Sequence, residues 1–168
     1  MNKSILLFPL LFLSLVACST SPNGNTEPEE GEQGGDSGEG DATVFEISVS
    51  SWEEADSSHI TRTSNGFTFT TNGTSNSGMI TDGALRVYAN CTLTISSSYT
   101  MNKIVFDCAS KVDKKEYKWG AGELSTTTGT YTYNNDETIG TWVGSSNSII
   151  FNTDQQARIK TFTITIIK

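Results

Sequence analysis

The residues that could support catalysis or metal binding are few and scattered. The only histidine, His59, lies in the stretch WEEADSSHIT, with Glu53, Glu54 and Asp56 nearby. No second histidine or cysteine stands at the spacing of a zinc site, and the chain has no phosphate-binding loop, nucleophile elbow or dinucleotide fingerprint. The scattered acidic residues do not select the carboxylate pair that glycoside hydrolysis requires. We therefore predict no catalytic residues, no cofactor and no metal: a protein that is not an enzyme.

A different chemistry is indicated at Cys18, where an apolar run ends. Residues 1–17 read MNKSILLFPLLFLSLVA, with one lysine near the start and no charge from Ile5 to Ala17. That run is too short for a membrane-spanning helix, which takes about 20 residues, but it has the layout of a secretory signal peptide. The sequence Leu15-Val16-Ala17-Cys18 resembles a bacterial lipobox. The alternative is an ordinary signal peptide with a cysteine nearby by chance.

The lipobox resemblance implies that residues 1–17 are removed and that Cys18 becomes the lipidated first residue. Two or more acyl chains anchor a protein firmly, whereas one chain binds a membrane only marginally. The next residue is Ser19 and not the aspartate that retains many lipoproteins in the inner membrane. We therefore expect a lipid-anchored protein of the outer membrane, exposed at the cell surface.

Residues 18–41 begin with Cys18 and continue as STSPNGNTEPEEGEQGGDSGEGD, which contains seven acidic residues and six glycines but no large apolar side chain. Such a segment cannot bury enough surface to offset its chain entropy. We predict a disordered tether. The tether carries most of the net charge of −8, and residues 42–168 are nearly neutral, with twelve acidic against ten basic residues. A nucleic-acid partner would need a basic patch, so none is expected.

Residues 42–168 are predicted to form a single all-β domain. Most of its segments are short, rich in Thr, Val, Ile, Phe and Tyr, and bounded by Gly, Asn, Asp or Ser, which are strand signals. No helical period is sustained, so we predict an antiparallel β-sandwich resembling a jelly roll, with an open barrel as the lesser possibility. The predicted strands lie near Val44–Val49, Gly66–Thr71, Leu85–Ala89, Cys91–Ser97, Lys103–Cys108, Glu116–Trp119, Thr130–Tyr133, Thr138–Val143, Ser148–Phe151 and Ile159–Ile167.

The stretch CTLTISSSYTMNKIVFDC is predicted to form a hairpin with a four-residue loop over 98–101. That register places Ile95 opposite Ile104, Leu93 opposite Phe106 and Cys91 opposite Cys108, with all six side chains on one buried face. Opposed cysteines can reach disulfide distance, and an envelope compartment permits the bond. We expect a structural disulfide between Cys91 and Cys108. The alternative is two buried thiols that pack as apolar groups.

Aromatic residues give the best indication of a ligand site. Tyr117 and Trp119 alternate in EYKWG, and Tyr131 and Tyr133 alternate in TYTY, so each pair points to one face of its strand. Such a face is either core packing or an open platform on which a sugar ring can stack. Tyr117, Trp119, Tyr131 and Tyr133 are therefore the predicted ligand-binding residues. Trp52 and Trp142 are expected in the core or at its edge.

The stretches RVYANCTLTIS, NKIVFDC, TYTYNN and GTWVGSSNSIIFNTDQQARIKTFTITI follow one another in this order. Together they resemble a β-sandwich module that recurs in surface lipoproteins and secreted proteins of the Bacteroidota. The resemblance extends over residues 66–168 and consists of turns and strands rather than reactive side chains. It implies a sandwich fold and a surface location, and it transfers no catalytic residue.

Two functional classes follow from these observations. The first is a non-catalytic module that binds a glycan or a protein ligand at the cell surface. The second is a structural subunit of a surface or fimbria-like assembly, in which a strand such as TFTITIIK pairs with a neighbour's open sheet edge. The first class is favoured, because nothing in residues 19–61 indicates the cleavage step that release from the anchor would need.

Overall fold

Threonine, valine, isoleucine and phenylalanine favour extended backbone because branched and aromatic side chains pack well on a pleated surface. The computed structural model describes residues 40–55, 60–73, 77–109 and 119–168, all within one compact unit, residues 38–168. The described residues form ten strands: β1 (Ala42–Ser48), β2 (Thr61–Ser64), β3 (Phe67–Asn72), β4 (Met79–Thr81), β5 (Ala84–Val87), β6 (Thr92–Cys108), β7 (Leu124–Ser125), β8 (Thr130–Tyr133), β9 (Ile139–Thr153) and β10 (Ala157–Ile167). Two short 3-10 turns, η1 (Val49–Ser51) and η2 (Ala121–Glu123), complete the fold.

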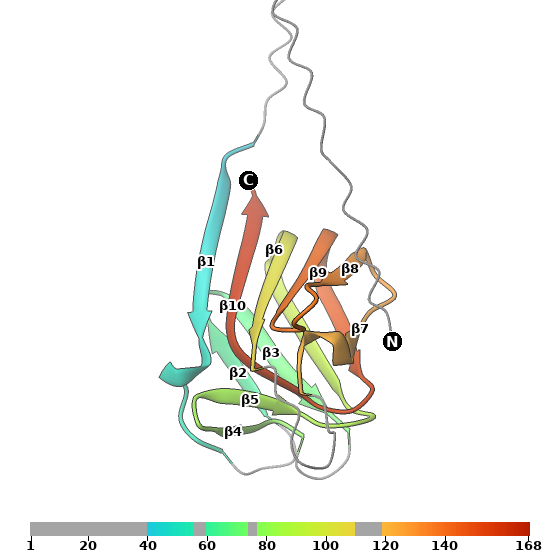
Figure 1. Cartoon of the computed structure of the whole chain (residues 1–168). Helices are drawn as coiled ribbons and strands as arrows, with labels where there is room; N and C mark the ends of the chain where they lie inside the picture. Colours follow the sequence, from blue (N-terminus) through green and yellow to red (C-terminus); the bar gives the residue numbers. More distant parts are fainter. Residues whose placement is uncertain (1–39, 56–59, 74–76, 110–118) are drawn as a thin grey trace, which may run out of the picture. The chain divides into compact units, whose positions relative to one another are not determined.

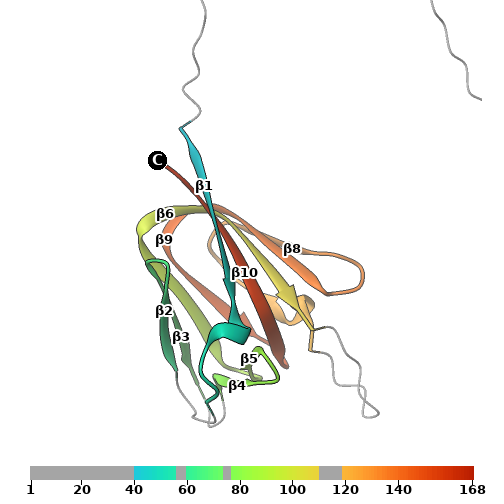
Figure 2. The same ribbon diagram turned by 90° about the vertical axis from the view of Figure 1, so that its left-hand side faces the viewer.

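Every pair of strands is antiparallel, and the sheet curls into two layers (Figures 1 and 2). One layer runs β1-β10-β6-β9-β8, and the other runs β2-β3-β6-β9-β7. β6 and β9 belong to both layers because each is long and bent. The short β4–β5 hairpin continues from the beginning of β10. The predicted all-β antiparallel sandwich is confirmed.

Phenylalanine side chains from the two layers pack together in the interior. The rings of Phe69 in β3 and Phe162 in β10 lie 4.6 Å apart, and those of Phe106 and Phe151 lie 4.8 Å apart. Trp142 in β9 is fully buried in the same core, as predicted. These aromatic contacts join the two layers inside the core, in addition to β6 and β9, which run through both layers.

The bend in β6 and β9 is made of small polar residues. β6 pairs Ser96 with Ser148 of β9 and then Met101 with Ser146, so the ladder skips several residues of β6. A bulge of this kind bends the strand and increases its twist. Serine is the commonest residue in both bends, SSSYT over 96–100 and GSSNS over 144–148, and its small side chain lets both strands cross from one layer to the other.

The predicted hairpin over CTLTISSSYTMNKIVFDC is therefore wrong, because its intended loop is the bend inside one continuous strand. The face assignment is nevertheless confirmed: the six predicted inward residues are all buried. When a strand bends over into a second layer, alternate side chains on both of its halves face the core. Its burial pattern is therefore the same as that of a hairpin.

The predicted disulfide between Cys91 and Cys108 is also wrong. Cys91 directly precedes β6 and Cys108 ends it, so the two residues stand at opposite ends of the strand and are not joined. Each thiol is 1% exposed. The alternative of buried thiols that pack as apolar groups describes them correctly.

The other predicted strands divide into three groups. Those near Val44–Val49, Gly66–Thr71, Leu85–Ala89 and Ile159–Ile167 are present as β1, β3, β5 and β10, and the TYTY strand is β8. Thr138–Val143 and Ser148–Phe151 are joined in β9. The segment 116–118 lies outside the described residues, and Trp119 belongs to none of the strands. β4 and β7 were not predicted because three and two residues give too short a pattern, and β2 was not predicted because TRTS contains no large apolar side chain.

Candidate binding site

The structure separates the residues predicted to bind a ligand. Cys18, His59 and Tyr117 lie outside the described residues. Trp119 stands next to β10, whereas Tyr131 and Tyr133 lie on β8, at the edge of the first layer. The three described aromatic residues therefore do not form one platform, and each is considered in its own surroundings.

Tyr131 is partly buried and packs against the core. Its ring makes edge contacts with Phe106 and Phe151, each with centroids 5.9 Å apart, and its hydroxyl donates a hydrogen bond of 2.9 Å to the carbonyl of Ala121. Gly140 on the neighbouring strand makes room for this ring, because a β-carbon there would collide with the Tyr131 hydroxyl. Burial raises the pKa of the Tyr131 hydroxyl above its ordinary value. Tyr131 therefore contributes to core packing and not to an open platform for a sugar ring.

Tyr133 shares the face of Tyr131 but is 54% exposed. β8 ends at Tyr133, and the turn that follows leaves the core. The hydroxyphenyl ring is therefore accessible at the rim of the sandwich. It is the member of the TYTY pair that can still contact a ligand.

Trp119 is held against β10 by two interactions with Arg158. Its carbonyl accepts a hydrogen bond of 3.2 Å from the Arg158 amide, and the Arg158 guanidinium carbon lies 3.3 Å from the centroid of its ring. The Nε of Arg158 donates to Oε1 of Gln156 at 3.0 Å. A guanidinium over an indole face is a favourable cation–π arrangement. The Trp119 ring and the guanidinium therefore orient each other at the surface.

The arginine over Trp119 belongs to a row of side chains that crosses four neighbouring segments. Met79 of β4 pairs with Arg86 of β5, and Arg86 pairs with Arg158 of β10, next to Trp119. Directly opposed residues point to the same face of a sheet, and here that face is the outer one, since Leu85, Val87 and Ile159 beside the two arginines are buried. We refer to Met79, Arg86, Arg158 and Trp119 as the Arg–Trp row.

The sequence T-D-G-A positions a carboxylate beside this row. Asp82 and Gly83 both have positive φ, 54° and 68°, between the paired residues Thr81 and Ala84. Asp-Gly is the preferred loop of such two-residue hairpins, because both positions need a left-handed backbone. The turn places the Asp82 carboxylate 2.8 Å from Nη2 of Arg86.

Arg86 is held by two hydrogen bonds, and its side chain is still partly exposed. Its Nη2 donates to Thr81 Oγ1 and to Asp82 Oδ2, both at 2.8 Å. The Arg86 side chain is 17% exposed, and the Asp82 side chain is 85% exposed. The Asp82 charge offsets the repulsion that two opposed arginines would otherwise feel.

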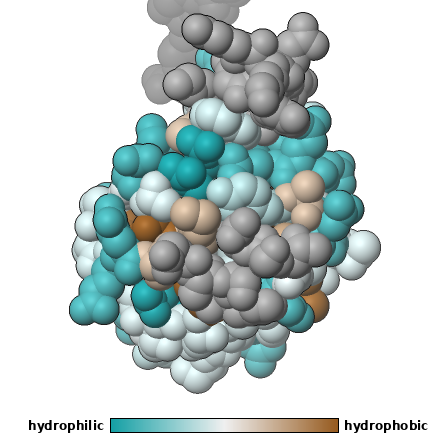
Figure 3. All heavy atoms as spheres, turned by 90° about the horizontal axis from the view of Figure 1, so that it is seen from below, coloured by the Kyte–Doolittle hydropathy of each residue, from teal (hydrophilic) through white to brown (hydrophobic). Residues whose placement is uncertain are grey.

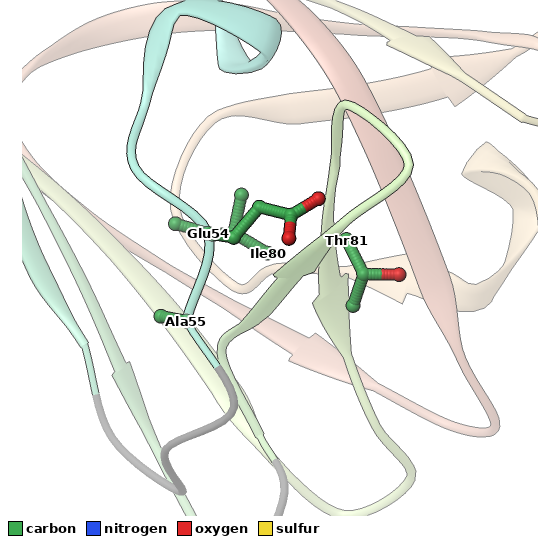
Figure 4. Close-up of a pocket in the computed structure, with 4 residues that line it drawn as sticks. All are labelled: Glu54, Ala55, Ile80 and Thr81. Carbon is green, nitrogen blue, oxygen red and sulfur yellow. The ribbon is translucent and has the colours of Figure 1, made fainter.

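A shallow hollow of about 310 Å³ adjoins the Arg–Trp row at Thr81 (Figure 4). Glu54 and Ala55, on the segment after η1, form one side, and Ile80 and Thr81 of β4 form the other. The segment is tied to the strand by hydrogen bonds in both directions between the backbones of Ala55 and Ile80. Thr81 therefore belongs to both features, because it lines the hollow and accepts a hydrogen bond from Arg86.

The hollow is lined by two polar residues, Glu54 and Thr81, and by two apolar ones, Ala55 and Ile80. Such a lining suits a ligand that offers both hydroxyl groups and apolar ring atoms, rather than an apolar helix. Hydrophobic residues also form only small separate patches among hydrophilic ones on the face of the molecule seen from below in Figure 3. Among the described residues no group of three or more His, Cys, Asp or Glu side chains could hold a metal ion.

Sequence reasoning found Trp119 but missed Asp82, Arg86 and Arg158. The Asp-Gly dipeptide between MIT and ALRV was a hairpin signal and would have placed Asp82 close to Arg86. No local pattern connects Arg158 with Arg86, because more than seventy residues separate them.

The chain matches no protein-family model, no curated protein and no solved structure. In the part that the structure describes, no helix has the length and apolar character needed to cross a bilayer. The function is therefore argued from the sequence signals and from the site itself.

Proposed function

We propose that this chain is a non-catalytic binding protein, anchored through a lipid at Cys18 in the outer membrane and exposed at the cell surface, that holds a glycan or a protein ligand. The anchor is supported by the lipobox-like sequence at residues 15–18 and by the apolar run before it. The long acidic segment over 19–41 supports display at a distance from the lipid surface.

The observation that carries the binding role is the Arg–Trp row beside the hollow. Sugar hydroxyls both donate and accept hydrogen bonds, and the exposed Asp82 carboxylate beside the row, held in place by Arg86, can accept from them. Hydrogen bonds to charged groups are stronger than neutral ones. The indole of Trp119 adds an aromatic surface to the same row. A few fixed polar groups beside apolar surface are the usual composition of a small-ligand site.

A protein ligand is the other member of this class. Tryptophan, tyrosine and arginine are enriched among the residues that dominate protein interfaces, and the row with nearby Tyr88 contains all three types. The hydroxyl of Tyr88 donates to the Met79 sulfur at 3.6 Å, which keeps both side chains on this surface. A glycan remains favoured, because the hollow is small and mixed in polarity.

Retention on immobilised polysaccharides tests the proposal. The full chain should be retained by at least one member of a broad glycan panel, and Arg158→Ala should weaken that retention about tenfold, equal to about 1.4 kcal/mol. Lys103→Ala is the matched control, because Lys103 is an exposed cation near the other end of β10 and outside the row. Equal retention of the two variants, or no retention of the wild type by any glycan or envelope protein, would contradict the proposal.

Assembly into a fimbria-like structure is the second candidate. The strand order does not support an assembly in which TFTITIIK pairs with a neighbouring molecule. Residues 161–166 of β10 are paired with β1 on one side and with β6 on the other, so both edges of this strand are already used.

A further inference from the structure

The outermost strands of the sheet differ in how much open edge they offer. Among the described residues, β1, β2, β4, β7 and β8 each form a ladder with a single strand. β1 has seven residues, whereas the others have two to four. The outer side of β4 is also covered by the bridge between Ala55 and Ile80. β1 is thus the long open edge, with β10 on its inner side (Figure 1).

β1 lacks the features that usually protect an edge strand. Proteins blunt open edges with lysine, proline, bulges or very short strands, because unpaired amides and carbonyls otherwise pair with another chain. The strand reads ATVFEIS, and its ladder with β10 runs from Ala42 to Ser48 without a break in register. Glu46 is its one charged residue. This edge is therefore suited to pairing with a further strand.

We propose that β1 pairs antiparallel with β1 of a second copy of this chain, so that the sheets of two molecules form one continuous sheet. The register that we assign is centred on Val44, which faces its equivalent, while Glu46 faces Ala42 of the other copy. This register avoids placing two Glu46 carboxylates opposite each other, which would be unfavourable. A register centred on Glu46 would do so.

The side chains on the outer face of this edge support a second copy as the occupant. Val44 is 60% exposed and Ile167, on the adjacent β10, is 50% exposed. Ala42 pairs with Ile167, so the three apolar side chains adjoin one another. A two-fold axis through Val44 brings this exposed side chain against its own copy, with Ala42 and Ile167 beside it, and an isologous contact of this kind is self-complementary.

The length of chain before β1 allows both copies to share a membrane. In this register Ala42 of the second copy lies level with Glu46, so the starts of the two β1 strands are four residues apart along the strands, about 14 Å. The 24 residues from Cys18 to Asp41 can extend to about 80 Å. If Cys18 is lipidated as proposed, confinement to one membrane also raises the effective concentration of the partner.

Cysteine cross-linking in the native envelope tests the pairing. Full-length Val44→Cys should form a covalent dimer under mild oxidation, seen on a non-reducing gel, because directly opposed residues of paired strands reach disulfide distance. Thr132→Cys is the matched control: Thr132 is exposed on β8, the opposite edge of the same layer. It should stay monomeric, as should the wild type, whose Cys91 and Cys108 are buried.

Two outcomes would overturn the inference: a monomeric Val44→Cys variant, or equal cross-linking of Val44→Cys and Thr132→Cys, which would indicate random collision. A second variant avoids dependence on disulfide chemistry. Val44→Lys should abolish the dimer in sedimentation of the detergent-extracted protein while leaving its melting temperature unchanged, since Val44 is exposed. Retention on glycans by this variant separates the two proposals, because loss of the dimer leaves the Arg–Trp row intact.

Discussion

Two tryptophans in this domain occupy opposite kinds of environment. Trp142 is fully buried on β9, and its indole nitrogen donates to the carbonyl of Thr128. Gly129 and Gly144 stand against its ring, where a β-carbon at either position would collide with it. Trp119, in contrast, lies at the surface against the Arg158 guanidinium. One ring is fully buried, and the other is partly buried beside a charged neighbour.

The difference shows what a large aromatic side chain contributes in each place. Burial of a tryptophan supplies hydrophobic free energy and fixes the packing around it. A partly buried tryptophan in a cation–π contact contributes less to folding, and its exposed part can contact a ligand. The interior around Trp142 should therefore control stability, and the region around Trp119 should control binding.

The largest expected effect comes from the interior. Trp142→Ala should lower the free energy of unfolding by about 3 to 5 kcal/mol, the usual cost of truncating a buried large aromatic residue. Urea denaturation of the folded domain measures this. A loss below about 1 kcal/mol would mean that Trp142 does not support the core as its burial indicates.

The next largest expected effect is a loss of folding stability at alkaline pH, caused by the buried thiol of Cys108. Burial, with the charge of Asp107 adding, raises the pKa of the Cys108 thiol from 9.0 to about 12. In the unfolded chain the thiol ionises from about pH 9, whereas in the folded domain it stays protonated, so the stabilisation present below pH 9 is lost as the pH rises toward 12. The slope should approach about 1.4 kcal/mol per pH unit.

The free energy of unfolding, measured at intervals from pH 8 to 10.5, tests this dependence. The Cys108→Ala variant should show a shallower decline than the wild type over the same range. Parallel curves for the two proteins would assign the alkaline loss to other groups, such as Tyr131, whose pKa is also raised.

A smaller effect is expected from one hydrogen bond at the margin of the core. Tyr131→Phe removes the hydroxyl that donates to the Ala121 carbonyl but keeps the ring contacts. The expected loss is about 1 kcal/mol, the net contribution of a typical hydrogen bond. Thermal unfolding monitored by circular dichroism measures it. Tyr133→Phe is the control, since Tyr133 is exposed and its change should leave the melting temperature unaltered.

The smallest effect on stability should come from Trp119. Trp119→Ala removes the cation–π contact with Arg158 and should cost about 1 kcal/mol or less, while it weakens retention on the cognate glycan or protein ligand. Measuring both quantities on one preparation sharpens the contrast with Trp142. A loss of stability as large as that of Trp142→Ala would place Trp119 with the core and remove the argument for binding at this row.

The sequence predicted the fold class and many strands, because alternation and side-chain type act within a few neighbouring residues. Leu93, Ile95, Ile104 and Phe106 were correctly assigned to a buried face. Their burial period is the same in a hairpin and in a bent strand, so the sequence could not distinguish the two. The disulfide prediction failed for that reason: it depended on the register of a hairpin that does not form.

Local chemistry thus determined the extended segments, the Asp-Gly turn and the lipobox-like sequence on which the anchor proposal rests. The tertiary structure alone decided that β6 and β9 pass through both layers and that Arg86 and Arg158 face each other beside Trp119. Strand partners are chosen by burial of the whole sheet, which sums contacts between residues far apart in the chain. No single stretch of the sequence contains that information, so the candidate site became visible only when the strands were paired.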